Sequence, residues 1–462
     1  MNHPVPMTDV GLHKTAATAA LRQPSAMWAL TVLTALLVFV WSVPHTIALR
    51  YLLLAMALAL ASWHVGRAAL VAAMNAARIP LIALAMLTAW LVIQALLISP
   101  ERDWALGEIS GQWLVGIAAL LLGLLLGALG NRRAGLAQRA ALLAITTALL
   151  MLAAVGVGQS IAHYFTDGEL LRQEVPITGG KLEMSFVVNI LLAILAVDLV
   201  QRAAGSRPFL PLPVWTNCGA IAIGLASAYL AGARNGIIGL VFLGISGIVL
   251  VMFYHRRDIG LRRAFWGAAA LAVMLAGFAY ASYRADPRWK PFGESVAIGW
   301  DIDAHKEWLD AGQGPYPTRA DGTTVDPSAY VRVAYIRAGL REIARHPLGV
   351  GYGRNAFGHS LRQTLPTRLG HAHSGFIDLG VGGGIPALAL WLAWIAALFV
   401  VAWRGYFRHG SPSGLLLLLL LSGYTGRMVL DSVSKDHMLQ LFMFLAGFLL
   451  IAAQQERRAE PE

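Results

Sequence analysis

Apolar runs of about 20 residues recur along the whole chain, and they restrict the fold more than any other feature. About 20 residues of α-helix, at about 1.5 Å per residue, cross the hydrocarbon core of a bilayer. The runs are rich in Leu and Ala and hold few turn residues, which favours helices over barrel strands. Hydrophobic residues make up 57% of the 462, more than a soluble domain can bury. We therefore predict an all-α polytopic membrane protein.

The runs predict about twelve transmembrane helices. Their expected ranges are 27–43, 46–63, 80–99, 113–130, 139–158, 184–201, 213–231, 235–254, 264–282, 375–403, 413–430 and 437–453. The first run is followed directly by others, so we interpret it as a retained anchor and not as a cleaved signal peptide.

Basic residues in the short loops predict the orientation of these helices, because cytoplasmic loops are enriched in Lys and Arg. The loops on the side of both termini hold 17 such residues, whereas the alternating loops hold 7. The richer set includes Arg132, Arg133, Arg256, Arg257, Arg457 and Arg458. Both termini are therefore expected in the cytoplasm. This predicts cytoplasmic tails at 1–26 and 454–462, helices at 27–282 and 375–453, and a polar segment facing outward at 283–374.

The outward segment is unusually basic and partly helical. It holds 12 Lys or Arg against nine Asp or Glu in a chain of net charge +11. Apolar residues recur at helical spacing from Tyr330 to Arg345, and His346-Pro347 is expected to end that helix. Residues 286–329 are expected to be coil, with a short helix near Ala304–Leu309. A soluble module in which basic and aromatic residues alternate is absent, so nucleic acid is not an expected partner.

The residue inventory excludes several kinds of site. The single cysteine, Cys218, lies in an apolar run, so no disulfide framework or thiolate metal site can form within one chain. No set of His, Asp and Glu has convincing metal-ligand spacing, and we interpret Asp301-Ile-Asp303 as a solvated turn. A serine nucleophile would need an elbow motif that the sequence lacks. We therefore expect no metal and no cofactor.

Three stretches remain that could carry chemistry, and the first is Ala231-Gly-Ala-Arg-Asn-Gly-Ile-Ile-Gly-Leu240. It places Arg234 at the outer end of a span, where a charge is costly unless it reaches water or a partner. Arg234 is therefore a candidate for binding an anionic group. The alternative is an arginine that merely anchors the helix at the interface.

The second stretch runs from Arg332 to His346-Pro-Leu-Gly-Val-Gly-Tyr-Gly-Arg-Asn-Ala-Phe357. Its glycines allow tight turns and close backbone approach, but it is neither a P-loop nor a dinucleotide motif. Arg332 is a candidate catalytic residue. Further candidates for binding substrate are Arg337, Arg341, Arg354 and His346. Because the helical arginines are spread around the helix, not all of them can serve one ligand.

The third stretch is His371-Ala-His-Ser-Gly-Phe-Ile-Asp378-Leu-Gly-Val-Gly-Gly-Gly-Ile-Pro386. His373 lies where the outward segment meets the next span, and a neutral imidazole there could accept a proton from a hydroxyl. The alternative is a capping or merely exposed histidine. His371 is expected to be a neighbour. Asp378 lies about 140° around the helix from His373, so we do not expect it to orient that ring.

Together these stretches resemble the O-antigen ligase family of bacterial membrane proteins. Ala-Arg-Asn-Gly is similar to the family's Ser-Arg-Gly element, and the stretch from Arg332 through His346-Pro-Leu-Gly-Val-Gly is similar to its Arg, His-Pro and Gly-x-Gly signature. His373-Ser374, followed by Gly384, resembles its His-Asn/Ser and Gly element, although Ser374 replaces the commoner Asn. The resemblance covers about 225–400 by motif.

The resemblance implies a GT-C-like glycosyltransferase with one large periplasmic loop, in the bacterial inner membrane. Its implied partners are undecaprenyl-diphosphate-linked O-antigen as donor and lipid A–core as acceptor, and the reaction is implied to be inverting and metal-independent. Carried onto this chain, Arg234 and Arg332 would bind the diphosphate and His373 would activate the acceptor hydroxyl. Alternatives are an O-antigen polymerase, a pilin O-glycosyltransferase and, from another class, a membrane transporter.

Overall fold

The structure is a computed structural model that describes residues 23–129, 136–255, 260–286, 291–310 and 313–456. Most of each expected cytoplasmic tail lies outside these residues, as do Arg132, Arg133, Arg256 and Arg257. The described part of the chain contains helices and no β-strand. An all-α membrane protein is therefore confirmed.

Each expected span coincides with one long helix. These are α2 (Gln23–Trp41), α3 (Ile47–His64), α5 (Arg78–Leu97), α7 (Leu114–Leu129), α8 (Leu136–Asp167), α9 (Lys181–Ala203), α10 (Val214–Ala231), α11 (Arg234–His255), α12 (Leu261–Ala285), α16 (Gly375–His409), α17 (Pro412–Met428) and α18 (Asp436–Glu456). Within the described residues, ten helices are long and apolar enough to cross a membrane. Because α2 and α17 do not meet that criterion, the number twelve stays a prediction.

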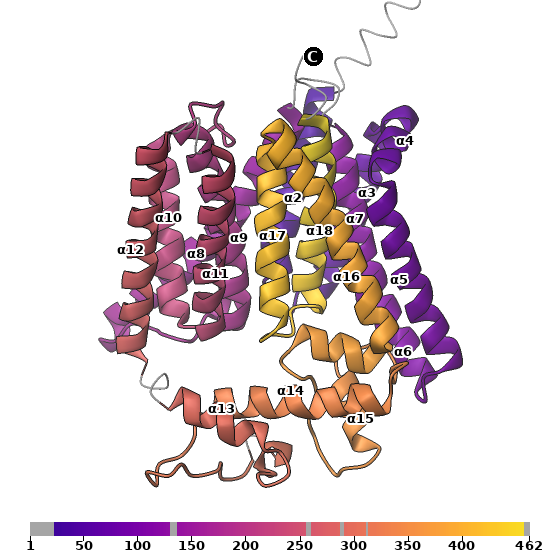
Figure 1. Ribbon diagram of the computed structural model, residues 1–462. Coiled ribbons are helices and arrows are strands. Elements are labelled where there is room, and N and C mark those ends of the chain that lie inside the picture. The colour runs from indigo at the N-terminus through magenta and orange to yellow at the C-terminus, as the bar shows by residue number, and fades with distance from the viewer. Residues whose placement is uncertain (1–22, 130–135, 256–259, 287–290, 311–312, 457–462) are drawn as a thin grey trace, which may run out of the picture.

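The long helices form one bundle in which α18 is central (Figure 1). It packs most extensively against α7 and also contacts α16 and α17. Glycines allow the α7–α18 contact, since a Cβ on Gly123 would lie 2.1 Å from the Phe444 carbonyl oxygen and one on Gly447 would lie 2.4 Å from that of Leu120. Small residues permit such close helix packing in membranes, where dispersion contacts stabilise association.

The shorter elements were not all predictable. On the side of the bundle that carries the C-terminus, α4 (Arg67–Ala76) follows α3. At the opposite end, α6 (Arg102–Glu108) and the π-helical turn η1 (Ile109–Trp113) lead into α7, and η3 (Pro176–Thr178) precedes α9.

The segment 283–374, which we call the outward layer after its predicted orientation, lies across one end of the bundle, with α13 (Phe292–Trp300) and α14 (Pro327–Arg345) crossing beneath the bundle in Figure 1. The expected helix at 330–345 is present and begins three residues earlier, because Asp326 caps its N-terminus and Pro327 occupies its first turn. The coil expected at 286–329 is wrong in part, since it contains α13. The turn η5 (Glu307–Asp310) lies near the expected short helix, and α15 (Ala356–Arg362) was not predicted.

The outward layer has its own hydrophobic core, which packs on the first turns of α16. Tyr330, Ala334 and Ala338 lie on the buried face of α14, at helical spacing. Gly339 lets α14 meet α16, because a Cβ there would lie 2.1 Å from Cγ2 of Ile377. The outward layer is therefore anchored to the membrane helix that follows it.

Candidate functional site

A buried ion pair joins the bundle to the outward layer. Nη2 of Arg234, the first residue of α11, donates to Oδ1 of Asp326 at 2.7 Å, and their side chains are 9% and 0% exposed. The same Asp326 oxygen accepts from the backbone N–H of Ala329 as the cap of α14. Arg234 is thus more than an interfacial anchor, since it lies against the first turn of α14.

Arg332 lies one turn further along α14. Its guanidinium donates to the side chain and the carbonyl oxygen of Ser328. Its charge contributes, after burial, to lowering the pKa of both His371 and His373. Arg332 precedes Tyr335 by three residues on α14, and the Tyr335 ring stacks on His373, so Arg332 lies on the side of α14 that meets the histidines.

His373 is held in a constrained position between α14 and α16. Its ring stacks on Tyr335 with ring centroids 5.9 Å apart, and the His371 ring lies 4.4 Å away, nearly edge-on. His373 has φ of 53°, which is uncommon for a residue with a side chain and points to a tightly held backbone. His371 is the neighbour that the sequence analysis expected.

Asp378 fixes the backbone of this histidine pair without touching the rings. Its Oδ1 accepts from the N–H of Ala372 at 2.7 Å, and its Oδ2 accepts from Ser432 Oγ at 2.5 Å. Ser374 caps α16 and donates to the carbonyl oxygen of Met428. The residues on each side of His373 are therefore tied to α16 and to the end of α17.

Burial, helped by the nearby charge of Arg332, keeps the histidines neutral. Burial lowers the pKa of His373 to about 4 and that of His371 to about 3. Lys435 lowers both pKa values as well, whereas Asp431 raises that of His373. At neutral pH the His373 ring is unprotonated and can accept a proton. Among the neighbouring charges, Arg332 has the largest effect on its pKa.

The remaining candidate arginines have other contacts. Arg337 lies over the Trp300 ring at 5.0 Å, and Arg341 forms a two-pronged exposed pair with Asp303. This pair lowers the pKa of Asp303. Both arginines therefore face α13 and its following turn, whereas Arg332 lies on the side of the histidines. As expected, the arginines of α14 do not all serve one site.

Arg354 and His346 lie at the two ends of the glycine-containing loop. Arg354 pairs with Glu108 of α6 at 2.8 Å and with Asp436 of α18 at 3.4 Å. His346 is half-buried at the end of α14, where its carbonyl oxygen accepts from the Gly349 N–H. Among the described residues, no cluster of three or more His, Cys, Asp or Glu could hold a metal ion.

Glycines of the second and third stretches allow close backbone packing between the loop at 347–353 and the first part of α16. Val350 and Gly351 donate backbone hydrogen bonds to Val381 and Gly382, and Ile385 donates to Pro347. A Cβ on Gly384 would lie 2.4 Å from the Leu348 carbonyl carbon. The close backbone approach that the sequence predicted is confirmed.

Comparison with known proteins supports the resemblance found in the sequence. Residues 219–392 match the family described as O-antigen ligase, and this range includes Arg234, Arg332 and His373. The match supports assignment of this part of the chain to the O-antigen ligase family. No curated protein matches the chain. The family supports an enzyme that transfers glycans in a membrane.

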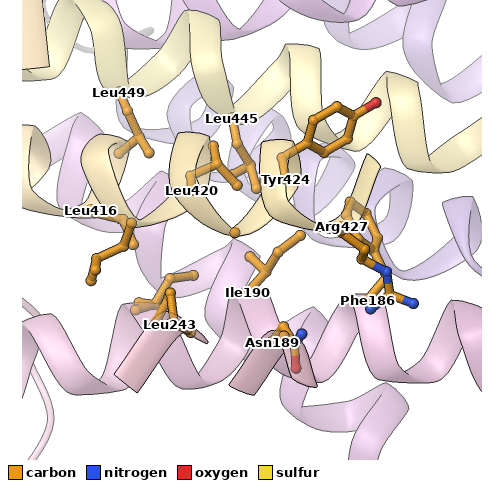
Figure 2. Close-up of a pocket in the computed structure, with 15 residues that line it drawn as sticks. Phe186, Asn189, Ile190, Leu243, Leu416, Leu420, Tyr424, Arg427, Leu445 and Leu449 are labelled. Atoms are coloured by element: carbon orange, nitrogen blue, oxygen red, sulfur yellow. The ribbon is translucent and has the colours of Figure 1, made fainter. Parts of the chain in front are cut away.

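The sequence analysis missed one buried arginine next to the site. Arg427 of α17 pairs with Asp431 at 3.0 Å and donates to Ser185 Oγ and the Leu182 carbonyl oxygen of α9. Figure 2 shows it beside Phe186 at one end of a pocket lined mainly by apolar side chains. Its signal was a charge at the outer end of a leucine-rich run, which in a membrane needs a partner.

Proposed function

We propose that the protein is an O-antigen ligase of the bacterial inner membrane. It transfers O-antigen from undecaprenyl diphosphate to an outer-core sugar of lipid A–core, on the periplasmic side. The proposal rests on the position of Arg332 on the side of α14 that meets a buried, neutral His373, six residues along the chain from the partner of Arg234, Asp326. Cations and a base meet there at the outer end of a membrane bundle.

Arg234 and Arg332 have the chemistry to bind the donor diphosphate. A guanidinium is permanently charged and presents a planar fork of N–H donors that matches phosphate oxygens. The leaving diphosphate gains negative charge as the glycosidic C–O bond breaks, so fixed cations stabilise the transition state more than the ground state. Charge supplied by arginine suits a metal-independent reaction.

His373 would act as the general base. The acceptor oxygen forms a bond to the anomeric carbon, its proton passes to the imidazole, and the lipid diphosphate departs with the electron pair of the broken bond. Attack opposite the leaving group inverts the anomeric carbon. The pKa of His373 is about 4, and the Arg332 charge contributes to lowering it, so a dianionic ligand on Arg332 would offset that charge and raise the proton affinity of the base when substrate is bound.

The bundle offers room for the lipid part of the donor. An apolar cavity of about 420 Å³ lies among α9, α10, α11, α12 and α17. It shares Ala193, Leu243 and Leu419 with the pocket that Arg427 borders. An isoprenoid chain in this cavity would keep the diphosphate at the outer end of α11, close to Arg234.

The decisive experiment supplies purified protein with lipid-linked glycan and one of three acceptors: lipid A–core, a second lipid-linked glycan or a pilin peptide. Transfer to lipid A–core alone supports the ligase. Transfer to the second lipid-linked glycan would instead identify a polymerase, and transfer to the peptide a pilin glycosyltransferase. Absence of transfer to all three would contradict a glycosyltransferase and favour transport.

A further inference from the structure

A polar cavity, distinct from the apolar cavity among α9, α10, α11, α12 and α17, lies at the outer end of the bundle, and we call it the outer cavity. It has a volume of about 450 Å³, within the range of about 300–1,000 Å³ that is typical of small-ligand sites. Its wall comes from the α2–α3 turn, α3, η1, η3, α9, α18 and the loop that carries Arg354. The residues that line it include Ser42, Tyr51, Glu183, Asp436, His437 and Gln440.

Three residues that line the outer cavity each carry a buried polar atom with no hydrogen-bond partner among the described residues. These atoms are Ser42 Oγ, His437 Nε2 and Gln440 Oε1. Ser42 is 1% exposed and Gln440 is 4% exposed. Buried polar groups are normally hydrogen-bonded, so the arrangement of these residues around one cavity indicates a ligand rich in hydrogen-bonding groups.

The other lining groups favour an uncharged polyhydroxylated ligand. Glu183 and Asp436 supply carboxylate acceptors, which Arg50 and Arg354 balance with cationic donors. A wall with both signs of charge selects against a strongly anionic ligand. The half-exposed Tyr51 ring adds an apolar face of the kind on which the C–H side of a sugar ring stacks. Together these groups match a pyranose.

The backbone around the outer cavity is constrained in the same way as the backbone at His373. Among the described residues, positive φ outside glycine occurs at His45, Gln173, His373 and Asp436. His45 and Asp436 line the cavity, with φ of 61° and 49°. Backbone held in sparsely populated conformations is concentrated at functional sites.

The loop between α17 and α18 separates the outer cavity from His373. Asp431 raises the pKa of His373 and Lys435 lowers it, whereas the next residue, Asp436, lines the cavity. The Arg234 side of the site belongs to α11, and α17 packs between α11 and α18. The outer cavity and Arg234 therefore belong to different helices of the bundle.

We infer that the outer cavity binds a sugar of the acceptor's core oligosaccharide. This inference rests on the proposed ligase function for its choice of sugar. Ser42, His437 and Gln440 hydrogen-bond the sugar hydroxyls, Glu183 and Asp436 accept from others, and Tyr51 packs against the ring.

Direct binding tests the inference without transfer. The probe is the oligosaccharide released from lipid A–core by mild acid, observed by saturation-transfer NMR with the purified full chain. Gln440→Leu and Tyr51→Ala should each weaken binding about ten-fold, which corresponds to about 1.4 kcal/mol. The matched controls are Gln94→Leu, a buried glutamine of α5, and Tyr164→Ala, an exposed tyrosine of α8; neither lines the cavity.

Equal binding by wild type, Gln440→Leu and Tyr51→Ala would overturn the inference, as would no binding by wild type, which leaves the cavity to water. His373→Ala separates this result from a failure of the proposed function, because that variant should lose transfer yet bind the oligosaccharide normally. In the transfer assay, Gln440→Leu should raise the acceptor KM about ten-fold and leave the donor KM unchanged. A rise in the donor KM instead would place the donor's glycan in the cavity and contradict the inference.

Discussion

Arg234 and Asp326 form a buried ion pair between residues 92 positions apart, which fixes the start of α11 to the start of α14. The pair does two things at once. It attaches the outward layer to the membrane bundle, and it holds the Arg234 guanidinium beside the turn that leads to Arg332. The fold and the proposed donor site therefore depend on the same contact.

Substitution of either partner separates these two roles. Removing one member of a buried pair costs about 3–5 kcal/mol because the other charge stays buried. We expect Asp326→Asn, which keeps the capping ability of the side chain, to lower the melting temperature but retain measurable transfer. Arg234→Ala should lower the melting temperature similarly and also abolish transfer. Equal transfer by the two variants in a purified assay would reduce Arg234 to a structural role.

His373→Ala should abolish transfer while leaving expression and membrane insertion intact, because the imidazole is needed for proton removal, worth about 10²–10⁴-fold. The control is His409→Ala, at the far end of α16, the helix that follows His373. The measurement is glycan transfer to lipid A–core by purified protein. Undiminished transfer would remove His373 from the mechanism.

Arg332→Lys should lose most transfer activity, because lysine keeps the charge but not the planar fork. Arg345→Lys, on the exposed side of the same helix, is the control. Arg332→Ala should also raise the pKa of His373, since the Arg332 charge is one cause of its low value. Full activity of the lysine variant would show that Arg332 acts as a simple point charge.

Stability should fall on acidification. The pKa values of His371 and His373 are about 3 and 4 in the folded chain, below the ordinary value near 6.5, so the unfolded chain binds protons first as the pH falls. The stability that the two neutral histidines contribute to the folded chain is complete above pH 6.5 and is lost as the pH falls towards 4. The melting temperature of His371→Gln, His373→Gln protein should therefore depend less on pH between 6.5 and 4 than that of wild type. Parallel curves would contradict this assignment.

Gly384→Ala should destabilise the outward layer, for two reasons. Gly384 has φ of 76°, which disfavours a side chain, and an added Cβ would lie 2.4 Å from the backbone of Leu348. Gly293→Ala on α13 is the matched control, since its Cβ would meet no atom within 4 Å. Limited proteolysis of the outward layer reports the difference, and identical cleavage rates in the two variants would argue against the backbone contact.

Local pattern was sufficient for the membrane helices and for α14. Long apolar runs must be helical in lipid because every backbone N–H and C=O group needs an internal partner, so hydropathy alone located each long helix to within a few residues at most ends. Helix α14 was readable because its apolar residues repeat with helical period and a His-Pro pair ends it. Helix α13 was not, since its short sequence, rich in Gly and flanked by Pro and Asp, has the composition of a loop.

The sequence by itself determined the class of protein, the helical bundle and the three motifs with their candidate residues. Only the tertiary structure decided which of those residues meet: Arg332 lies on the side of α14 that meets His373, while Arg337 and Arg341 face α13. It also revealed the contacts of Asp326, Asp378 and Arg427, and the outer cavity. The physical reason is that helical periodicity specifies a face, whereas a partner on another helix depends on how the bundle packs. Buried polar groups acquire their roles from contacts far away in the chain.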